Sequence, residues 1–127
     1  MENRLRLKPR LAAAARQVRQ GVVAADVGTD HGYLACFLAQ ERICPMVYAS
    51  DLNRAPLEQA ARTVRECRLE GQVILLLSDG VAALPLEEID DVVAAGMGGD
   101  LILSIVGDPR LRDPEKRLVL QPMTKAE

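Results

Sequence analysis

One stretch of the sequence combines acids, glycines and a histidine in a way that packing alone does not require. The stretch VVAADVGTDHGYLA, residues 22–35, runs from small apolar residues into a polar loop. The loop contains, in order, Asp26, Gly28, Asp30, His31 and Gly32. Glycines permit a tight turn and let backbone N–H groups approach a ligand closely, while carboxylates accept hydrogen bonds or face a cation. The stretch is therefore a candidate ligand-binding loop.

Two further acids follow apolar runs later in the chain. Asp51 lies 25 residues after Asp26, close to the offset of about 20 residues at which an acid binds a ribose diol in nucleotide-binding α/β folds. Asp79 follows a third run, where it could accept a hydrogen bond from an adenine amine. Gly80 beside it has no side chain and so gives a ligand access to the backbone. A fourth run ends in the block Gly96, Met97, Gly98 and Gly99. Together these positions predict an adenosine site.

The charge of the loop favours one kind of adenosine ligand. Dinucleotide sites use G-x-G-x-x-G and place a pyrophosphate at a helix N-terminus. This chain has D-x-G-x-x-x-G with Asp30 inside the loop, and two carboxylates repel a pyrophosphate. They suit an ammonium or sulfonium group, so S-adenosylmethionine is favoured over NAD.

Structural roles remain open for each residue taken singly. Asp26 could be a turn residue, Asp51 a helix N-cap, and residues 96–99 a close helix–strand contact. His31 is the single histidine, which excludes a histidine-pair metal site, and as a lone loop residue it is more often hydrogen-bonded than catalytic. The three cysteines form no C-x-x-C pair, so we expect no metal.

The elements that must position these residues alternate along the chain. Apolar runs predict strands over residues 22–27, 46–51, 73–77, 91–96 and 117–122, and helical spacing predicts helices opened by Pro9 and Pro56 and over residues 33–40 and 100–106. A short turn or helix is expected near residues 81–84 and a loop over 107–116. This alternation predicts an α/β fold with a doubly wound, open parallel sheet flanked by helices, which would bring the strand ends to one rim. We treat residues 1–127 as one domain, and the abrupt end after Pro122 suggests a fragment that lacks C-terminal strands.

Composition and charge restrict the cellular location and the partners that we expect for the protein. No apolar run approaches the roughly 20 residues of a membrane helix, and the basic N-terminus has no apolar segment behind it, so we expect a cytoplasmic protein with reduced thiols and no membrane partner. The net charge is −2, yet residues 1–20 carry six basic side chains and one acid. That basic arm could steer the protein toward phosphates or could be a solvated helix face.

Several blocks taken together resemble a known family. ADVGTDHGYLA, SDLNRAPLEQA, LLLSDGVAAL, VVAAGMGGDLI and LVLQPMTKAE resemble the TrmK-type enzymes, bacterial tRNA methyltransferases that modify N1 of adenine 22. The likeness runs from about Leu7 to the last residue. The G-T-D-H-x-Y-L and A-G-M-G-G blocks are specific to that family.

The resemblance implies a Rossmann-like class I methyltransferase with strand order 3-2-1-4-5, S-adenosylmethionine as cofactor and tRNA as partner. It implies Asp30 as the catalytic acid and Arg10, in the pair Arg10-Leu11, as a substrate-binding residue. Tyr33 is the one plausible stacking platform for a base. The implied cofactor-binding residues are Asp26, Gly28, His31, Gly32, Tyr33, Asp51, Leu52, Asp79, Gly80, Gly96, Met97 and Gly98.

The chain departs from its relatives at three points. Lys8 stands where many have a small residue, and Ala35 stands where they have proline. Family members also continue into a helical C-terminal domain thought to hold tRNA. A module that binds the cofactor without methylating therefore remains an alternative, and an NAD-dependent oxidoreductase is a less favoured one.

Overall fold

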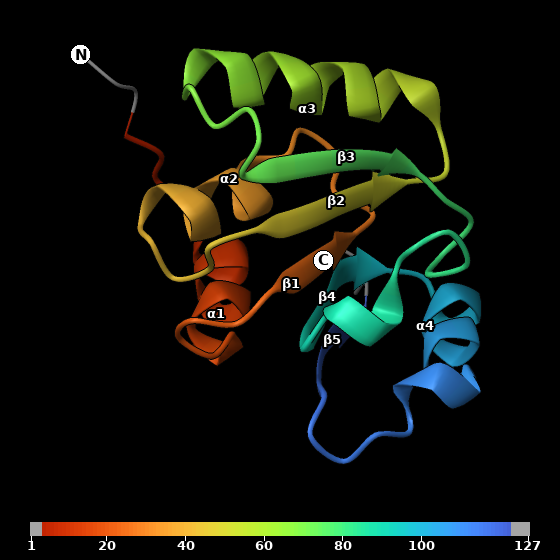
Figure 1. Ribbon diagram of the computed structural model, residues 1–127. Helices are drawn as coiled ribbons and strands as arrows, with labels where there is room; N and C mark the ends of the chain where they lie inside the picture. The colour runs from red at the N-terminus through yellow and green to blue at the C-terminus, as the bar shows by residue number, and fades with distance from the viewer. Residues whose placement is uncertain (1–3, 123–127) are drawn as a thin grey trace.

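A computed structural model describes residues 4–122 as one parallel sheet between two layers of helices (Figure 1). The strands are β1 (Ala24–Val27), β2 (Val47–Asp51), β3 (Val73–Leu77), β4 (Asp91–Met97) and β5 (Arg117–Pro122). The helices are α1 (Pro9–Gln17), α2 (Tyr33–Gln40), α3 (Arg54–Glu66) and α4 (Gly99–Val106), with short 3₁₀ turns η1 (Leu86–Glu88) and η2 (Pro109–Leu111).

The strand order is β3-β2-β1-β4-β5 with every pair parallel, which confirms the predicted fold class and order. The order reverses at β1, where the chain crosses from β3 back to β4. In such a sheet, ligands bind beyond the carboxyl ends of the strands at that reversal. The topology therefore places the loop after β1 at the expected binding position.

Alternate residues of each central strand enter two separate cores. Ala24 of β1 packs in one core with α1, α2 and α3, while Ala25 packs in the other with α4 and the 3₁₀ turns. All four residues of β1 are buried, as expected for a parallel strand covered on both faces. Small alanines on β1 let both helical layers approach the sheet closely.

Most predicted boundaries are confirmed, and two that differ have structural causes. The helix over residues 33–40 and the strands over 73–77 and 117–122 match the prediction. Strand β1 begins at Ala24 instead of Val22, because pairing with β2 and β4 starts at Ala24, and the N–H of Val23 donates to the Asp90 side chain at 3.1 Å instead of to a neighbouring strand. Helix α3 begins at Arg54, two residues before Pro56, since a proline is tolerated throughout the first turn, where N–H groups lack helical partners.

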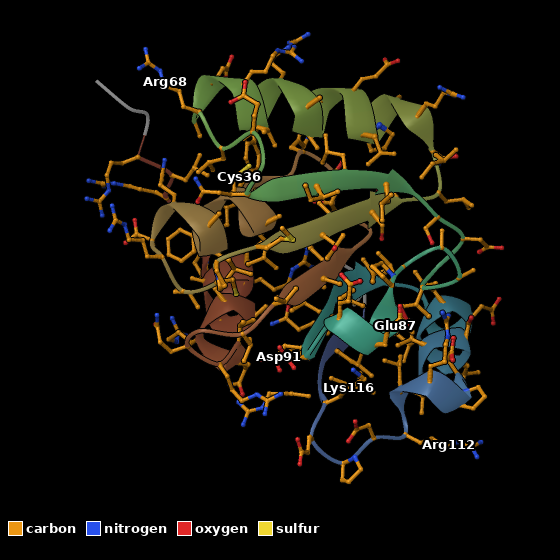
Figure 2. The ribbon with its side chains drawn as sticks, viewed as in Figure 1. Cys36, Arg68, Glu87, Asp91, Arg112 and Lys116 are labelled. Carbon is orange, nitrogen blue, oxygen red and sulfur yellow. The ribbon has the colours of Figure 1, made fainter. Side chains whose placement is uncertain are left out.

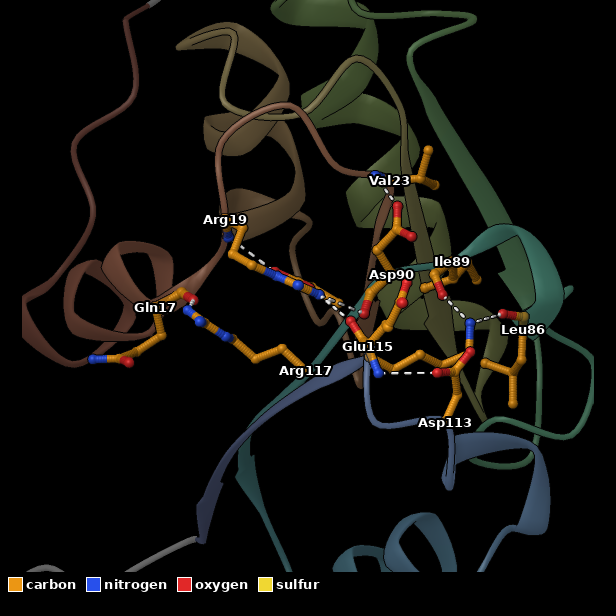
Figure 3. Close-up of polar contacts among 11 residues, drawn as sticks. Gln17, Arg19, Val23, Leu86, Ile89, Asp90, Asp113, Glu115 and Arg117 are labelled. Atoms are coloured by element: carbon orange, nitrogen blue, oxygen red, sulfur yellow. Dashed lines mark hydrogen bonds and ion pairs between the residues drawn. The ribbon is translucent and has the colours of Figure 1, made fainter.

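A dense polar network closes the amino ends of β4 and β5, and Figure 2 marks Asp91 and Lys116 in this region. The Asp91 carboxylate is fully buried and accepts hydrogen bonds from the backbone N–H of Arg19 at 2.8 Å and from its Nε at 2.9 Å. Lys116 donates to the carbonyl of Leu86 at 2.7 Å, and Arg117 donates to the carbonyl of Gln17 at 2.8 Å (Figure 3). These contacts tie the end of α1 to the start of β4 and β5.

Two of the buried cysteines are unreactive, and the properties of the helices bear on membrane insertion. Cys36 and Cys44 are buried, and burial raises the pKa of each thiol to about 12, so neither is a reactive nucleophile. Within residues 4–122, no helix combines the length and apolar character needed to cross a membrane.

Candidate functional site

A cavity of about 1050 Å³ opens at the carboxyl ends of the strands, beside the loop that follows β1. It receives side chains from the segment before α1, from the loops after β1, β2 and β3, and from α4. The predicted site residues that line it are Arg10, Asp26, Gly28, Asp30, His31, Tyr33, Asp51, Leu52, Asp79, Gly80 and Gly96.

The loop after β1 is held tightly to β2. Gly28 has φ +73°, and its N–H donates to the carbonyl of Ser50 at 2.8 Å, as does the N–H of Thr29 at 2.9 Å. The Thr29 hydroxyl donates to Asp26 Oδ2 at 2.9 Å. This turn fixes the Asp26 carboxylate at the floor of the cavity.

Asp26 is the carboxylate most affected by its surroundings. It is 3 % exposed, and burial raises its pKa to about 7, although the hydrogen bond from Thr29 opposes the shift. A cation placed in the cavity would favour the ionised form. Asp26 can therefore respond to the charge of a bound ligand.

Asp30 presents a solvated carboxylate at the mouth of the cavity. Its backbone lies in the left-handed region with φ +56°, a conformation that Asp tolerates better than most residues, and its side chain is 76 % exposed. His31 Nε2 lies 3.9 Å from Asp30 Oδ1, and the His31 ring stacks on Tyr33 with centroids 5.2 Å apart. The exposed faces of this pair border the cavity.

Asp51 is oriented by two backbone donors. Its Oδ2 accepts from the N–H of Asp30 at 3.4 Å, and its Oδ1 accepts from the N–H of Asn53 at 3.1 Å. Asn53, not Asp51, is the N-cap residue of α3, so the structural alternative for Asp51 is wrong. Leu52 beside it is 61 % exposed, an apolar surface suited to a nucleobase face.

The loop after β3 brings Asp79 and Gly80 to the same cavity. The hydroxyl of buried Ser78 donates to the carbonyl of Gly80 at 2.8 Å and accepts from the N–H of Ala83 at 3.0 Å. Gly80 has φ +59°, and a Cβ there would meet Leu101 at 3.1 Å. The loop is thereby pinned, and the exposed Asp79 faces the cavity.

The three glycines at the end of β4 and the start of α4 differ in their surroundings. Gly96 has φ +72°, and a Cβ at this position would lie 3.2 Å from a guanidinium nitrogen of Arg10. Nothing lies within 4 Å of a Cβ built on Gly98 or Gly99, so close helix–strand packing does not explain those two residues. Gly98 is the N-cap of α4, and Met97 is the last residue of β4.

Gly32 and Gly98 are not among the described residues that line the cavity. Gly32 is the N-cap of α2 with φ +78°, and a Cβ there would lie 2.9 Å from the Cβ of Ala60 on α3. In the structure Gly32 allows α2 and α3 to approach each other. Its assignment to the cofactor site stays a prediction.

Sequence reasoning missed several lining residues. The additional polar residues are Arg6, Lys8, Thr29, Asn53, Ser78, Asp100 and Ser104. Asp100 and Ser104 are four residues apart on α4, a spacing that places them on one helical face. Only the position of that helix beside β4 reveals that this face meets the cavity.

The charges of the cavity are distributed unevenly. Five carboxylates line it, from Asp26, Asp30, Asp51, Asp79 and Asp100. Within residues 4–122, none of the five forms an ion pair with a lysine or arginine. In the same part of the chain, no group of three or more histidine, cysteine or acidic side chains could hold a metal ion. Uncompensated carboxylates around a glycine turn provide hydrogen-bond acceptors and a favourable environment for a cation.

Comparisons with known proteins agree with this geometry. The methyltransferase domain family matches residues 7–127. The tRNA (adenine(22)-N(1))-methyltransferase of Bacillus subtilis is 34 % identical over 122 residues, which cover 94 % of this chain and 51 % of that protein.

Solved structures of tRNA methyltransferases have a similar fold. TrmK of M. capricolum, in complex with S-adenosyl-homocysteine, superposes with a TM-score of 0.80 at 32 % identity, covering 94 % of this chain and 54 % of that one. A Streptococcus pneumoniae tRNA (m1A22) methyltransferase described as putative, in complex with S-adenosyl-L-methionine, gives a TM-score of 0.83 at 30 % identity, covering 92 % and 56 %. The chain spans about half the length of the curated relatives that it matches.

Proposed function

Because the chain belongs to the methyltransferase domain family, we propose that it binds S-adenosylmethionine and transfers a methyl group to N1 of an adenine in tRNA. One observation carries the proposal: five carboxylates without basic partners surround a glycine turn at the reversal point of the sheet. Such a site favours a cationic nucleoside over a pyrophosphate. The relatives solved with S-adenosyl-homocysteine or S-adenosyl-L-methionine support this choice.

Each end of the cofactor has a matching group in the cavity. Asp51 is oriented to accept hydrogen bonds from the ribose diol, and the exposed Leu52 offers an apolar face to the adenine. Asp79 accepts from the adenine amine. Asp26 faces the positively charged methionine end, and Gly28 lets the chain pass close to it. His31 and Tyr33 border this end.

Methyl transfer places modest demands on the protein. When bound, S-adenosylmethionine supplies an electrophilic methyl group on a sulfonium. The side chains around the cavity must then position the acceptor in line and keep water out. The acceptor is the lone pair of adenine N1, so the base must enter the cavity unpaired.

Asp30 is proposed to handle the charge that develops on the base. The bond formed from N1 to the methyl carbon would replace the carbon–sulfur bond of the sulfonium, so the thioether would leave neutral and the positive charge would pass to the adenine ring until a proton leaves its exocyclic amine. The exposed Asp30 carboxylate can accept a hydrogen bond from that amine, stabilise the cation and take the proton. Arg10, whose guanidinium lies against Gly96, is positioned to contact the incoming nucleotide.

The cofactor part of the proposal is tested by calorimetry with S-adenosylhomocysteine and with NAD. We expect the chain to bind the first and not the second, and Asp51→Ala to weaken that binding. Glu66→Ala, an exposed acid on α3, is the matched control. Equal binding of both ligands would contradict the assignment.

Methyl transfer is tested separately with labelled S-adenosylmethionine and transcribed tRNA. We expect the label on N1 of an adenine. Since the chain spans about half the length of its relatives, the competing possibility is a module that binds the cofactor and transfers nothing. Binding of S-adenosylhomocysteine with no labelled tRNA would favour that alternative.

A further inference from the structure

Residues 4–8, the N-terminal strap, lie outside the helices and strands and alternate between basic and apolar side chains. Leu5 and Leu7 are half-buried and pack against the core formed with α1, α2 and α3. Arg4, Arg6 and Lys8 alternate with them and are exposed. The alternation of exposed basic and half-buried apolar side chains gives the strap an exposed basic side.

The strap is anchored at its start. The N–H of Leu5 donates to Gln40 Oε1 at 2.8 Å, and Arg4 forms an ion pair with Glu41 at 3.1 Å. Both partners belong to the end of α2. At its other end the strap leads directly into α1, where the carbonyl of Arg10 accepts from Gln121 Nε2 of β5 at 3.2 Å. The anchored strap therefore holds its exposed side chains in a defined place.

That place is the border of the candidate site. Arg6 and Lys8 line the cavity together with Arg10, and the five carboxylates come from other segments. Within residues 4–122, no ion pair joins Arg6, Lys8 or Arg10 to an acid, whereas Arg4, Arg19 and Arg110 each have one. The cavity thus has an acidic part and a separate basic border.

We propose that Arg6 and Lys8, continuing to Arg10, form a phosphate-binding rim for the backbone of an RNA strand whose unpaired adenine enters the cavity. This inference rests on the proposed function and adds the surface that receives the substrate. Neutralising each phosphate releases counterions, so the contacts should be visible as salt dependence.

The test compares two double variants with equal loss of charge. Arg6→Gln/Lys8→Gln removes the rim, and Arg62→Gln/Arg65→Gln removes two exposed arginines from α3, outside the cavity lining. Binding of transcribed tRNA to each protein, saturated with S-adenosylhomocysteine, is measured across a series of salt concentrations.

We expect the rim variant to bind tRNA roughly tenfold more weakly at low salt and to lose about 1.4 from the slope of log affinity against log salt. The α3 variant should retain the affinity and slope of the unmodified chain. The charge-preserving variant Arg6→Lys/Lys8→Arg should restore binding, which a purely structural role of these side chains would not predict.

Three outcomes would overturn the inference: no tRNA binding by the unmodified chain, an unchanged slope in the rim variant, or equal losses in the two double variants. The affinity for S-adenosylhomocysteine is measured on the same proteins, so that every tRNA measurement is made at a known occupancy of the cofactor site. An unmodified chain that binds both ligands, with an unchanged rim variant, would overturn only this inference, whereas an unmodified chain that does not bind S-adenosylhomocysteine would overturn the proposed function.

Discussion

The acidic residues at the two ends of the sheet differ in whether a basic side chain compensates their charge. At the amino ends of β4 and β5, the carboxylate of Asp91 is fully buried and accepts hydrogen bonds from the backbone and side chain of Arg19. At the carboxyl ends, five carboxylates share one cavity, and none of them has a lysine or arginine partner within residues 4–122.

This difference separates structural from functional charge. A buried carboxylate is tolerated when a cation and hydrogen bonds compensate it, and such an arrangement leaves no capacity for a ligand. Carboxylates gathered without an ion-pair partner repel one another, which is a cost that binding of a cationic ligand would relieve. Changes at the amino end should therefore lower stability, and changes at the carboxyl end should alter binding and turnover.

The largest effect is expected from Asp91→Ala at the amino end. The substitution leaves the N–H of Arg19 and its guanidinium without their buried acceptor, so the free energy of unfolding should fall by about 3 kcal/mol. Urea denaturation followed by circular dichroism measures this, with Glu66→Ala as the control. A loss no larger than that of the control would contradict the structural role of Asp91.

Asp30→Asn should have the next largest effect, and on turnover alone. Asparagine tolerates the left-handed backbone of this position but cannot accept a proton, so methyl transfer to tRNA should fall about 100-fold. Affinity for S-adenosylhomocysteine and thermal stability should hardly change. Undiminished turnover would remove Asp30 from the mechanism.

Asp51→Ala should weaken cofactor binding by about thirtyfold, since hydrogen bonds to a charged group contribute about 1.5–3 kcal/mol. Unlike Asp91→Ala, it should not lower stability strongly, because it removes one of several mutually repelling carboxylates. Calorimetry and thermal unfolding on one sample test both halves. A large fall in stability with unchanged binding would instead show that Asp51, like Asp91, has a structural role.

The smallest effect should be a pH dependence from Asp26. Its pKa in the folded chain is raised to about 7, above the ordinary value of 3.8, so the folded state holds a proton that the unfolded state has lost. The associated stability is present at low pH and is lost as pH rises through about 7.

Binding of a cationic cofactor should have the opposite preference, for the ionised carboxylate. Affinity for S-adenosylmethionine should therefore increase by up to about tenfold between roughly pH 6 and pH 8. Asp26→Asn, which keeps the shape of the side chain, should flatten this increase. An equally steep profile in that variant would assign the titration to another group.

Much of the fold could be predicted from the sequence because its elements carry local signals. The apolar runs of β3 and β5 and the helix after Gly32 were located to the residue, since turn residues bound them. The start of β1, which differed from the prediction, depends on a partner far along the chain. The N–H of Val23 donates to the side chain of Asp90 and pairing begins only at Ala24, and no local pattern encodes that contact.

The residues of the candidate site also fall into two groups: those that the sequence predicted and those that only the structure located. Asp26, Asp51 and Asp79 were predicted from their positions after apolar runs, and the structure brings all three to one cavity. Asp100 and the basic residues of the strap were not assigned to it. Their spacing resembles that of ordinary solvated surfaces, and only the packing of α4 and the anchoring of Leu5 place them at the cavity.

By itself, the sequence determined the alternation of strands and helices, the glycine turn and the acids that end the strands, because these depend on local periodicity and on the conformational freedom of single residues. The tertiary structure decided which charges are compensated. Arg19 reaches Asp91 across 72 positions of the chain, while Arg6, Lys8 and Arg10 border the cavity without an acidic partner in the described residues. Pairing of charges depends on distances in space, and those are fixed only when the layers pack.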